Sequence, residues 1–268
     1  MSTTTLSRAA ARPGYGFRTV AQMEWRKLRT IRSTWYILGL FTASMVVLAM
    51  LVLSHEGYAR LSPADRALFD PTHDCFIGLV LGQLLLGTLG VLAITAEFSS
   101  GMIRATFAAV PRRPLVLAAK AAVLGTVTLA AGEVTAFAAF AAGQAVLKAP
   151  APHAMLGQPG VLRAVLVAGA YPALIALIGL GLAALIRHTA GAIGALVGVV
   201  FVLPLILLPF GEQNAAMKFL PEVIAENSIT AVKPVAASLS PGAGLGMLCL
   251  YAAIALAAGG YAMARRDA

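Results

Sequence analysis

The chain has 268 residues, of which 59% are hydrophobic and only 12% are charged, and its mean hydropathy is +0.85. Soluble domains are about 45–50% apolar, so this composition excludes an ordinary soluble enzyme and indicates an integral membrane protein. A formal charge of +9 would favour nucleic acid as the partner of a soluble protein. Here we expect no nucleic-acid partner, because the basic residues of a membrane protein orient its helices.

A basic N-terminal region precedes the first apolar segment. We expect a flexible leader over residues 1–14 and an amphipathic helix over residues 15–33, because "FRTVAQMEWRKLRTIRST" separates an apolar from a basic face at helical spacing. Such a helix lies in the membrane interface, and a solvated basic leader is the alternative. Glu24 falls within the apolar face, where its carboxylate either snorkels to water or pairs with a basic residue elsewhere.

Apolar segments then recur along the chain, each long enough to cross a hydrocarbon layer of about 30 Å. They predict an all-α membrane protein with six transmembrane helices in a domain over residues 34–263: 34–54, 75–95, 116–147, 161–186, 190–210 and 243–263. An even number of spans places both termini on one side, before a short tail at residues 264–268. Most of the 20 Lys and Arg residues then fall on that side, so the positive-inside rule predicts cytoplasmic termini.

The segment "AEFSSGMIRATFAAVPRRPLVLAAK" separates the second and third apolar segments. It is too charged to cross a membrane, yet it carries apolar anchors such as Ile103 and Phe107. Ser99 or Ser100 can cap a short helix from Ile103 to Ala109, and Pro111 would end it. A short surface helix of this kind either floats on the lipid headgroups or docks into a protein partner.

Two polar residues lie inside the third apolar segment. A charged carboxylate at the bilayer centre costs about 2.5–3.5 kcal/mol on insertion scales, so Glu133 should face protein or a water-filled cavity. Glu133 either serves a substrate path or proton uptake, or it is a protonated or hydrogen-bonded structural residue. Gln144 either lines the same path or forms a hydrogen bond between helices.

Sequence motifs for catalysis are absent. The chain has no GxxxxGK[ST] phosphate loop, no HExxH and no GxSxG, so we expect no enzyme activity, no catalytic residue and no metal or cofactor bound by this chain. Any ATP and Mg²⁺ must be bound by another subunit. Cys75 and Cys249 are expected to be packing residues, with a disulfide as the alternative, and His55, His73, His153 and His188 to be solvated loop residues.

Two further features concern packing and the outer surface. Residues 211–242 predict an outer cap in which "LPEVIAENSI" forms a short amphipathic helix, and a structureless loop is the alternative. Gly194 with Gly198, and Gly242 with Gly246, have the GxxxG spacing that lets helices approach closely, within the chain or between two chains.

The chain resembles a known family in two stretches. "EWRKLRTIRSTW", residues 24–35, and the segment over residues 96–120 are similar to the membrane subunit (permease) of ABC-2 type ATP-binding cassette transporters, particularly those of actinobacteria. The resemblance implies a type V exporter fold, with an amphipathic connecting helix at 15–33, a coupling segment at 97–113 that docks on a separate ATPase subunit, and an outer cap at 211–242. It implies that the connecting helix includes Glu24, Trp25, Lys27 and Arg29. It also implies that the residues that couple the chain to the ATPase are Glu97, Gly101, Arg104, Pro111, Arg112 and Arg113.

The resemblance also implies the function. The chain would be the permease subunit of an ATP-driven exporter in the bacterial plasma (inner) membrane, pairing with a second permease copy or paralogue and two separate ABC ATPase subunits. Its substrate would be a hydrophobic or amphipathic compound, and its other partner membrane lipid. An ion-coupled secondary transporter or channel using Glu133 is one alternative, and a non-transporting membrane scaffold is another.

Overall fold

The structure is a bundle of long helices. A computed structural model of the chain describes residues 16–55, 58, 62–207, 209, 216–231 and 239–265. Six helical stretches among them are long and apolar enough to cross a membrane: Arg32–Ser54, Leu79–Ser99, Arg113–Val146, Val161–Ile186, Thr189–Leu207 and Pro241–Arg265. The predicted class, a multi-pass all-α membrane protein, is therefore confirmed.

These spans are α2 (Arg32–His55), α5 (Leu79–Ser99), α7 (Arg113–Val146), α8 (Val161–Ile186), the run from α9 (Thr189–Val197) through the π-helix η2 (Gly198–Val202) to α10 (Leu203–Leu207), and α12 (Pro241–Arg265). The shorter elements are α1 (Phe17–Thr30), α3 (Pro63–Leu68), α4 (Pro71–Asp74), α6 (Met102–Ala109), the 3-10 turn η4 (Met217–Phe219) and α11 (Pro221–Ile229). α11 confirms the short helix predicted in the outer cap.

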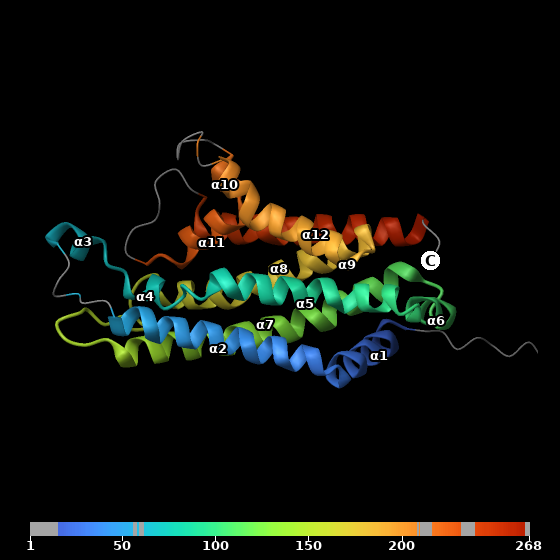
Figure 1. Cartoon of the computed structure of the whole chain (residues 1–268), viewed down its shortest axis with the longest axis horizontal. Coiled ribbons are helices and arrows are strands. Elements are labelled where there is room, and N and C mark those ends of the chain that lie inside the picture. Colours follow the sequence, from blue (N-terminus) through green and yellow to red (C-terminus); the bar gives the residue numbers. More distant parts are fainter. Residues whose placement is uncertain are drawn as a thin grey trace, which may run out of the picture.

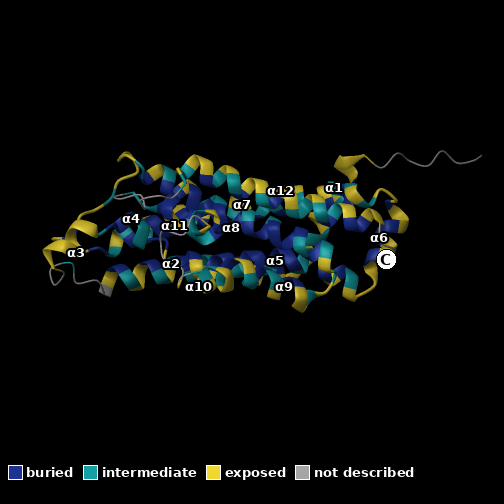
Figure 2. Ribbon diagram, turned by 90° about the horizontal axis from the view of Figure 1, so that it is seen from above, coloured by how far each residue is buried: buried dark blue, intermediate teal, exposed yellow. Residues whose placement is uncertain are grey.

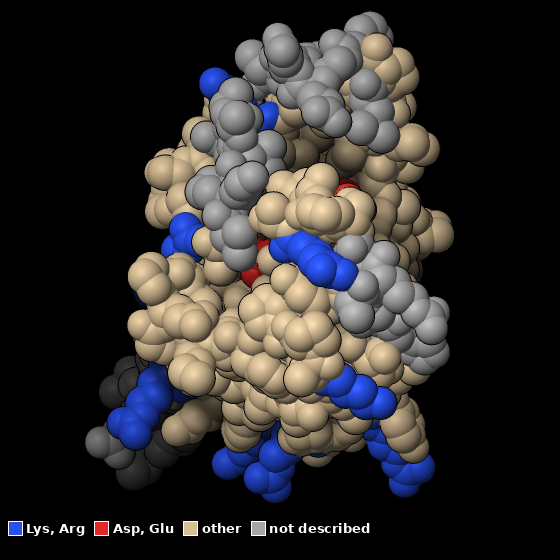
Figure 3. All heavy atoms as spheres, turned by 90° about the vertical axis from the view of Figure 1, so that its left-hand side faces the viewer, with Lys and Arg blue, Asp and Glu red and all other residues tan. Residues whose placement is uncertain are grey.

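The short elements gather at opposite ends of the bundle (Figure 1). α1, α6 and the C-terminal end of α12 lie at one end, the α6 end, while α3, α4 and α11 lie at the other, the α3 end. The described Lys and Arg residues of the α6 end are Arg18, Arg26, Lys27, Arg29, Arg32, Arg104, Arg112, Arg113, Lys120, Arg187 and Arg265. The acids Asp65, Asp70, Asp74, Glu222 and Glu226 lie at the α3 end, where Figure 3 shows small recessed acidic areas and, beside them, exposed Lys and Arg side chains.

α8 is the central helix of the bundle. It is the most buried of the six spans, at 72%, and it packs mainly against α5, α7 and α12. Figure 2 shows buried residues along α8 and the neighbouring part of α5. The backbones of α5 and α7 approach α8 closely, which explains its central position. A Cβ atom on Gly90 of α5 would lie 1.9 Å from the Ala176 carbonyl oxygen of α8. A Cβ atom on Gly132 of α7 would lie 2.2 Å from the Gly169 carbonyl oxygen of α8. Small residues of this kind drive helix packing in membranes, where lipid removes the hydrophobic driving force.

The predicted GxxxG pairs are not where the described helices make their close contacts. Among the described residues, no atom beyond the chain neighbours and the nearby backbone of the same helix lies within 4 Å of a Cβ atom built on Gly194, Gly198, Gly242 or Gly246. The close contacts instead use other glycines spread over four helices, among them Gly78 and Gly82, where added Cβ atoms would lie 2.7 Å from Met45 Cα and 2.8 Å from the Phe41 ring. Spacing within one helix cannot identify the packed face, since the contact depends on which neighbour lies opposite.

Several predicted boundaries need correction. The second span begins at Leu79 rather than residue 75, because α4 and a turn occupy the preceding residues, and it continues to Ser99. Glu97 therefore belongs to the last turn of a span and not to a separate surface segment. The predicted leader (1–14), residues 211–215 and 232–238 of the cap and residues 266–268 of the tail lie outside the described residues, as do residue 15 of the connecting helix and residues 208 and 210 of the fifth span.

Candidate functional site

Helix α6 begins at a sharp corner after α5. Gly101 stands just before α6 with φ of 72°, in the left-handed region that glycine adopts without a Cβ clash. The hydroxyl groups of Ser99 and Ser100 donate back to the Ala96 carbonyl at 3.2 and 2.7 Å, so neither serine caps α6 as predicted. The helix ends at Ala109, before Pro111 as expected.

A buried group of charged side chains lies beneath this corner, and we call it the ion cluster: Glu24 of α1, Lys27 of α1, Glu97 of α5 and Lys120 of α7. Lys27 Nζ lies 2.9 Å from Glu24 Oε1 and 3.2 Å from Glu97 Oε1. Lys120 Nζ lies 2.6 Å from Glu97 Oε1 and also pairs with Glu24 Oε2. The side chains of Glu24, Glu97 and Lys120 are at most 6% exposed, and that of Lys27 is 22% exposed.

Helix α6 joins the ion cluster through Thr106. The Thr106 hydroxyl donates to Glu97 Oε2 at 3.1 Å and accepts from Lys27 Nζ at 3.3 Å. The cluster and this hydroxyl thus connect α1, α5, α6 and α7. Because these side chains are desolvated, moving α6 alone would break hydrogen bonds that water does not readily replace.

The ion cluster is electrically balanced, with two carboxylates and two ammonium groups. A buried charge is expensive unless it is paired and hydrogen-bonded, and each member here has partners of opposite sign. Burial acts to lower the pKa of Lys27, but the hydrogen bond and charge of Glu24, together with the charge of Glu97, hold that pKa above its ordinary value. The pairing predicted as one alternative for Glu24 is thereby confirmed.

The residues predicted for coupling divide into two groups. Gly101, Arg104, Pro111 and Arg112 are exposed at the α6 end. Glu97 is only 4% exposed, so its carboxylate serves the ion cluster and is not open to a partner. Arg113 is half-buried: its guanidinium donates to the Met263 carbonyl at 3.2 Å, and it lies 5.2 Å from the ring centroid of Phe107.

The residues predicted for the connecting helix also divide. Glu24 and Lys27 point into the ion cluster, whereas Trp25 and Arg29 are exposed. The Trp35 indole N–H donates to the Arg29 carbonyl at 3.0 Å and so satisfies one of the free carbonyls at the end of α1.

Glu133 lies where α7 crosses α8. A Cβ atom on Gly169 of α8 would lie 2.8 Å from the Glu133 Cα, so only glycine fits opposite this carboxylate. Its Oε2 atom is buried, and no described residue hydrogen-bonds to it. This arrangement leaves both predicted interpretations of Glu133 open.

Gln144 has the contacts of a structural residue. Its amide N–H donates to the Pro71 carbonyl at 3.3 Å, and its Oε1 atom accepts from the Ala154 backbone at 2.9 Å. The first bond joins α7 to α4, as the interhelix alternative predicted, and the second joins α7 to the loop before α8. Cys75 beside it is buried, and burial raises the pKa of its thiol to about 12.

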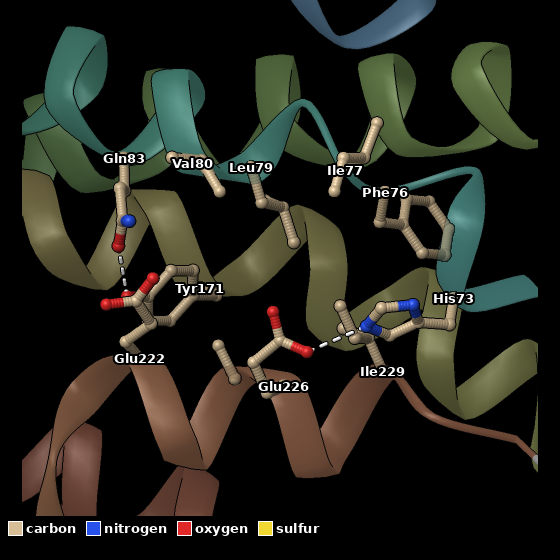
Figure 4. Close-up of a pocket in the computed structure, with 11 residues that line it drawn as sticks. His73, Phe76, Ile77, Leu79, Val80, Gln83, Tyr171, Glu222, Glu226 and Ile229 are labelled. Carbon is tan, nitrogen blue, oxygen red and sulfur yellow. Dashed lines mark hydrogen bonds and ion pairs between the residues drawn. The ribbon is translucent and has the colours of Figure 1, made fainter. Parts of the chain in front are cut away.

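A second polar group lies at the α3 end, between α4 and α11 (Figure 4). The His73 ring bonds to Glu226 at 2.7 Å and to Asp74 at 3.2 Å. The hydrogen bonds to Asp74 and Glu226 raise the pKa of His73 to about 10, although burial opposes the shift. His73 is therefore charged at neutral pH and is not the solvated residue that the sequence predicted. Burial, with the nearby charge of Glu226, raises the pKa of Glu222 above its ordinary value.

Further hydrogen bonds connect the elements at the α3 end. Asp70 accepts the backbone N–H of Thr72 at 3.0 Å and that of Ala231 at 2.6 Å, so it caps α4 and holds the chain that follows α11. Tyr171 of α8 donates its hydroxyl to Gln83 of α5 beneath the same site. Within the described part of the chain, no three His, Cys, Asp or Glu side chains are placed to hold a metal ion.

The chain matches no family model and no curated protein. The proposals below therefore rest on geometry and residue chemistry, together with the resemblance of the two sequence stretches described above.

Sequence reasoning gave no role in these sites to Lys120, Thr106, His73, Asp74 or Glu226. Lys120 was counted only as an orienting charge, although a lysine one or two turns inside an apolar helix needs a buried partner, which is a usable signal. Thr106 and His73 gave no comparable signal, because hydroxyl and imidazole groups are common on surfaces. Their roles depend on helices that lie far apart in the sequence.

Proposed function

We propose that this chain is the permease subunit of an ATP-driven ABC-2 exporter, working as a dimer with separate ATPase subunits. One observation carries the proposal. A short helix between two spans, α6, presents the exposed Arg104 at the end of the bundle, with the exposed Arg112 three residues beyond the helix, while its inner side is fixed to the ion cluster through Thr106.

This arrangement suits the transfer of force. A partner that pushes on α6 would also displace α5 through Glu97, α1 through Lys27 and α7 through Lys120, because the four groups share hydrogen bonds. A floating interfacial helix would need no such connection. The proposal places the ATP-dependent movement of a partner at the exposed face of α6.

The partner supplies the chemistry of ATP. In this proposal ATP and Mg²⁺ bind to the ATPase subunits, and this chain provides the surface that contacts them and the path for the substrate. The excess of Lys and Arg at the α6 end supports a cytoplasmic location for that end and for both termini in a bacterial plasma membrane. Export of a hydrophobic or amphipathic compound, and pairing with a second permease copy, follow from the family resemblance.

The test uses the exposed residues of this face. Arg104→Ala combined with Arg112→Ala should reduce, at least several-fold, both the amount of a phosphate-loop ATPase that co-purifies from native membranes and its stimulation by the chain. Lys148→Ala removes an exposed basic residue from the opposite end of the bundle and serves as the matched control. Normal recruitment and normal stimulation in the double variant would refute the proposal.

Glu133 supports a second candidate, an ion-coupled carrier or channel. Its buried Oε2 atom, unbonded among the described residues, is of the kind that proton and ion pathways use. This candidate predicts transport that continues without ATP, collapses with the proton gradient and is lost in Glu133→Gln. Transport that depends on ATP hydrolysis and survives Glu133→Gln would exclude it.

A further inference from the structure

A cavity of about 330 Å³ lies beside the ion cluster, enclosed by α1, the start of α2, the second half of α5 and the first half of α7. Ligand sites in proteins commonly begin at about 300 Å³ and combine apolar walls with a few polar groups. The cavity borders all four members of the ion cluster, of which three are almost completely buried. It therefore has the size and lining of a site for a small ligand.

The cavity has a polar end and an apolar end. Glu24, Glu97 and Lys120 belong to its polar lining, whereas its apolar lining includes Leu89, Leu92 and Leu124, which lie one to two turns further along α5 and α7 from the α6 end. Glu97 and Leu89 are eight residues apart on α5, a distance of about 12 Å along a helix. An elongated space that is polar at one end and apolar at the other fits an amphiphile with a single chain.

The cavity opens near the ends of two spans. Its exposed lining residues include Thr30 and Ser33, where α1 joins α2, and Ala96 and Met102, where α5 turns into α6. Since α2 begins at Arg32 and α5 ends at Ser99, this mouth lies at the ends of two apolar spans, where a membrane interface is expected. An amphiphile could enter from the adjacent leaflet through this mouth and pass its head inward, past the hydroxyl groups of Thr30 and Ser33, to the ion cluster.

The ion cluster determines which head the site accepts. Among the described residues, Glu24 accepts one hydrogen bond on each carboxylate oxygen, while Lys120 donates two. A carboxylate has about four acceptor positions and an ammonium group three donors, so both retain capacity. A hydroxyl group can donate to one and accept from the other. An anionic head would meet two carboxylates, and a cationic head two ammonium groups.

We propose that this cavity binds a neutral, hydroxyl-bearing amphiphile with a single alkyl chain, its head at Glu24 and Lys120 and its chain between Leu89 and Leu124. The site does not rest on the proposed exporter function, because it is formed within one chain. Binding is tested on the full chain alone, purified in lipid nanodiscs without an ATPase.

The probe is a dodecyl glucoside with a diazirine in its chain. After illumination, peptide mass spectrometry should place adducts on the cavity wall, on α5 near Leu92 and on α7 near Leu124, and unlabelled dodecyl maltoside should compete. Diazirine derivatives of dodecanoic acid and dodecylamine should give at least fivefold fewer adducts at these positions. Equal labelling by the acid or the amine would refute the proposed head.

Ala96→Trp is the blocking variant, since Ala96 lines the mouth and is exposed, so an indole can fill the opening without displacing the core. It should reduce cavity adducts at least fivefold. Ala122→Trp places the same ring on an exposed position of α7 away from the cavity and should leave them unchanged. Ala96→Phe replaces the first variant if elution shows misfolding. Unchanged cavity labelling in the blocked variant, or adducts spread over the whole chain, would overturn the site.

Discussion

Lys120 of α7 lies 2.6 Å from Glu97 of α5, and the two side chains are 6% and 5% exposed. Lys120 also pairs with Glu24 of α1, so one ammonium group connects three helices that are remote in sequence. Replacing a complete buried ion network by apolar groups is often neutral, whereas removing one partner leaves a buried charge without compensation.

Lys120→Met should therefore destabilise the protein strongly, by about 3–5 kcal/mol for a broken buried pair. Two carboxylates would then share Lys27 in a desolvated space. Thermal unfolding of the purified chain in detergent, followed by tryptophan fluorescence, measures the loss. Lys120→Arg keeps the charge and should recover most of the stability, and a Lys120→Met variant that melts with the wild type would show that the ion cluster adds no stability.

Glu24→Ala should loosen α1 from the bundle. Glu24 is the only acid on α1, it is 3% exposed, and it pairs with Lys27 and Lys120. Amide hydrogen exchange between Val20 and Leu28 should become faster, because an amphipathic helix of 14 residues is marginal without its tertiary contacts.

Gln22→Ala is the matched control for α1, since Gln22 is exposed on the same helix. Exchange in that variant should equal that of the wild type. If Glu24→Ala leaves exchange over α1 unchanged, the apolar face around Val20 holds the helix without help from the ion cluster.

The contact between α4 and α11 should depend on pH. The folded pKa of His73 is about 10 against an ordinary value of 6.5, so the charged imidazolium is favoured in the folded protein. Its contribution to stability is fully present below about pH 6.5 and is lost as the pH rises through about 10. The difference in melting temperature between the wild type and His73→Asn should follow this curve.

Comparison with His73→Asn removes the effect of other groups that titrate above pH 9. Glu226→Gln should lower the pKa of His73 and shift the loss to a lower pH, because Glu226 supplies one of its two partners. A difference between wild type and His73→Asn that stays constant from pH 6 to pH 11 would contradict the assigned ion pair.

Gly90→Ala should destabilise the bundle by about 1–3 kcal/mol, the usual cost of overpacking. The added Cβ atom would lie 1.9 Å from the Ala176 carbonyl oxygen, so α5 and α8 would have to separate. Gly194→Ala is the comparison, because no atom of the described residues beyond its chain neighbours and the nearby backbone of its own helix lies within 4 Å of its Cβ position. Thermal unfolding of both variants measures the difference in stability. Equal melting temperatures would mean that α5 and α8 separate at little cost in free energy.

The spans were predictable because each consists of a continuous apolar stretch, a local property. The apolar face of α1 was predictable for the same reason. Glu24 on that face predicted either snorkelling or a basic partner, and the structure shows the partner. The identity of that partner was not predictable, since Lys120 follows Glu24 by 96 residues. The GxxxG pairs predicted contacts that the described helices do not make. The motif at Gly194 and Gly198 is local and does not specify which helix, if any, lies opposite.

By itself the sequence determined that this protein crosses a membrane as six helices, and that its basic residues gather at one end, because hydropathy and charge act residue by residue. Only the tertiary structure decided that α8 occupies the centre, that Glu24, Lys27, Glu97 and Lys120 share one buried site, and that His73 bonds to Glu226. The physical reason is that pairing energy depends on distance in space. Helices of similar composition can be arranged in many ways until backbone contacts at positions such as Gly90 and Gly132 select one of them.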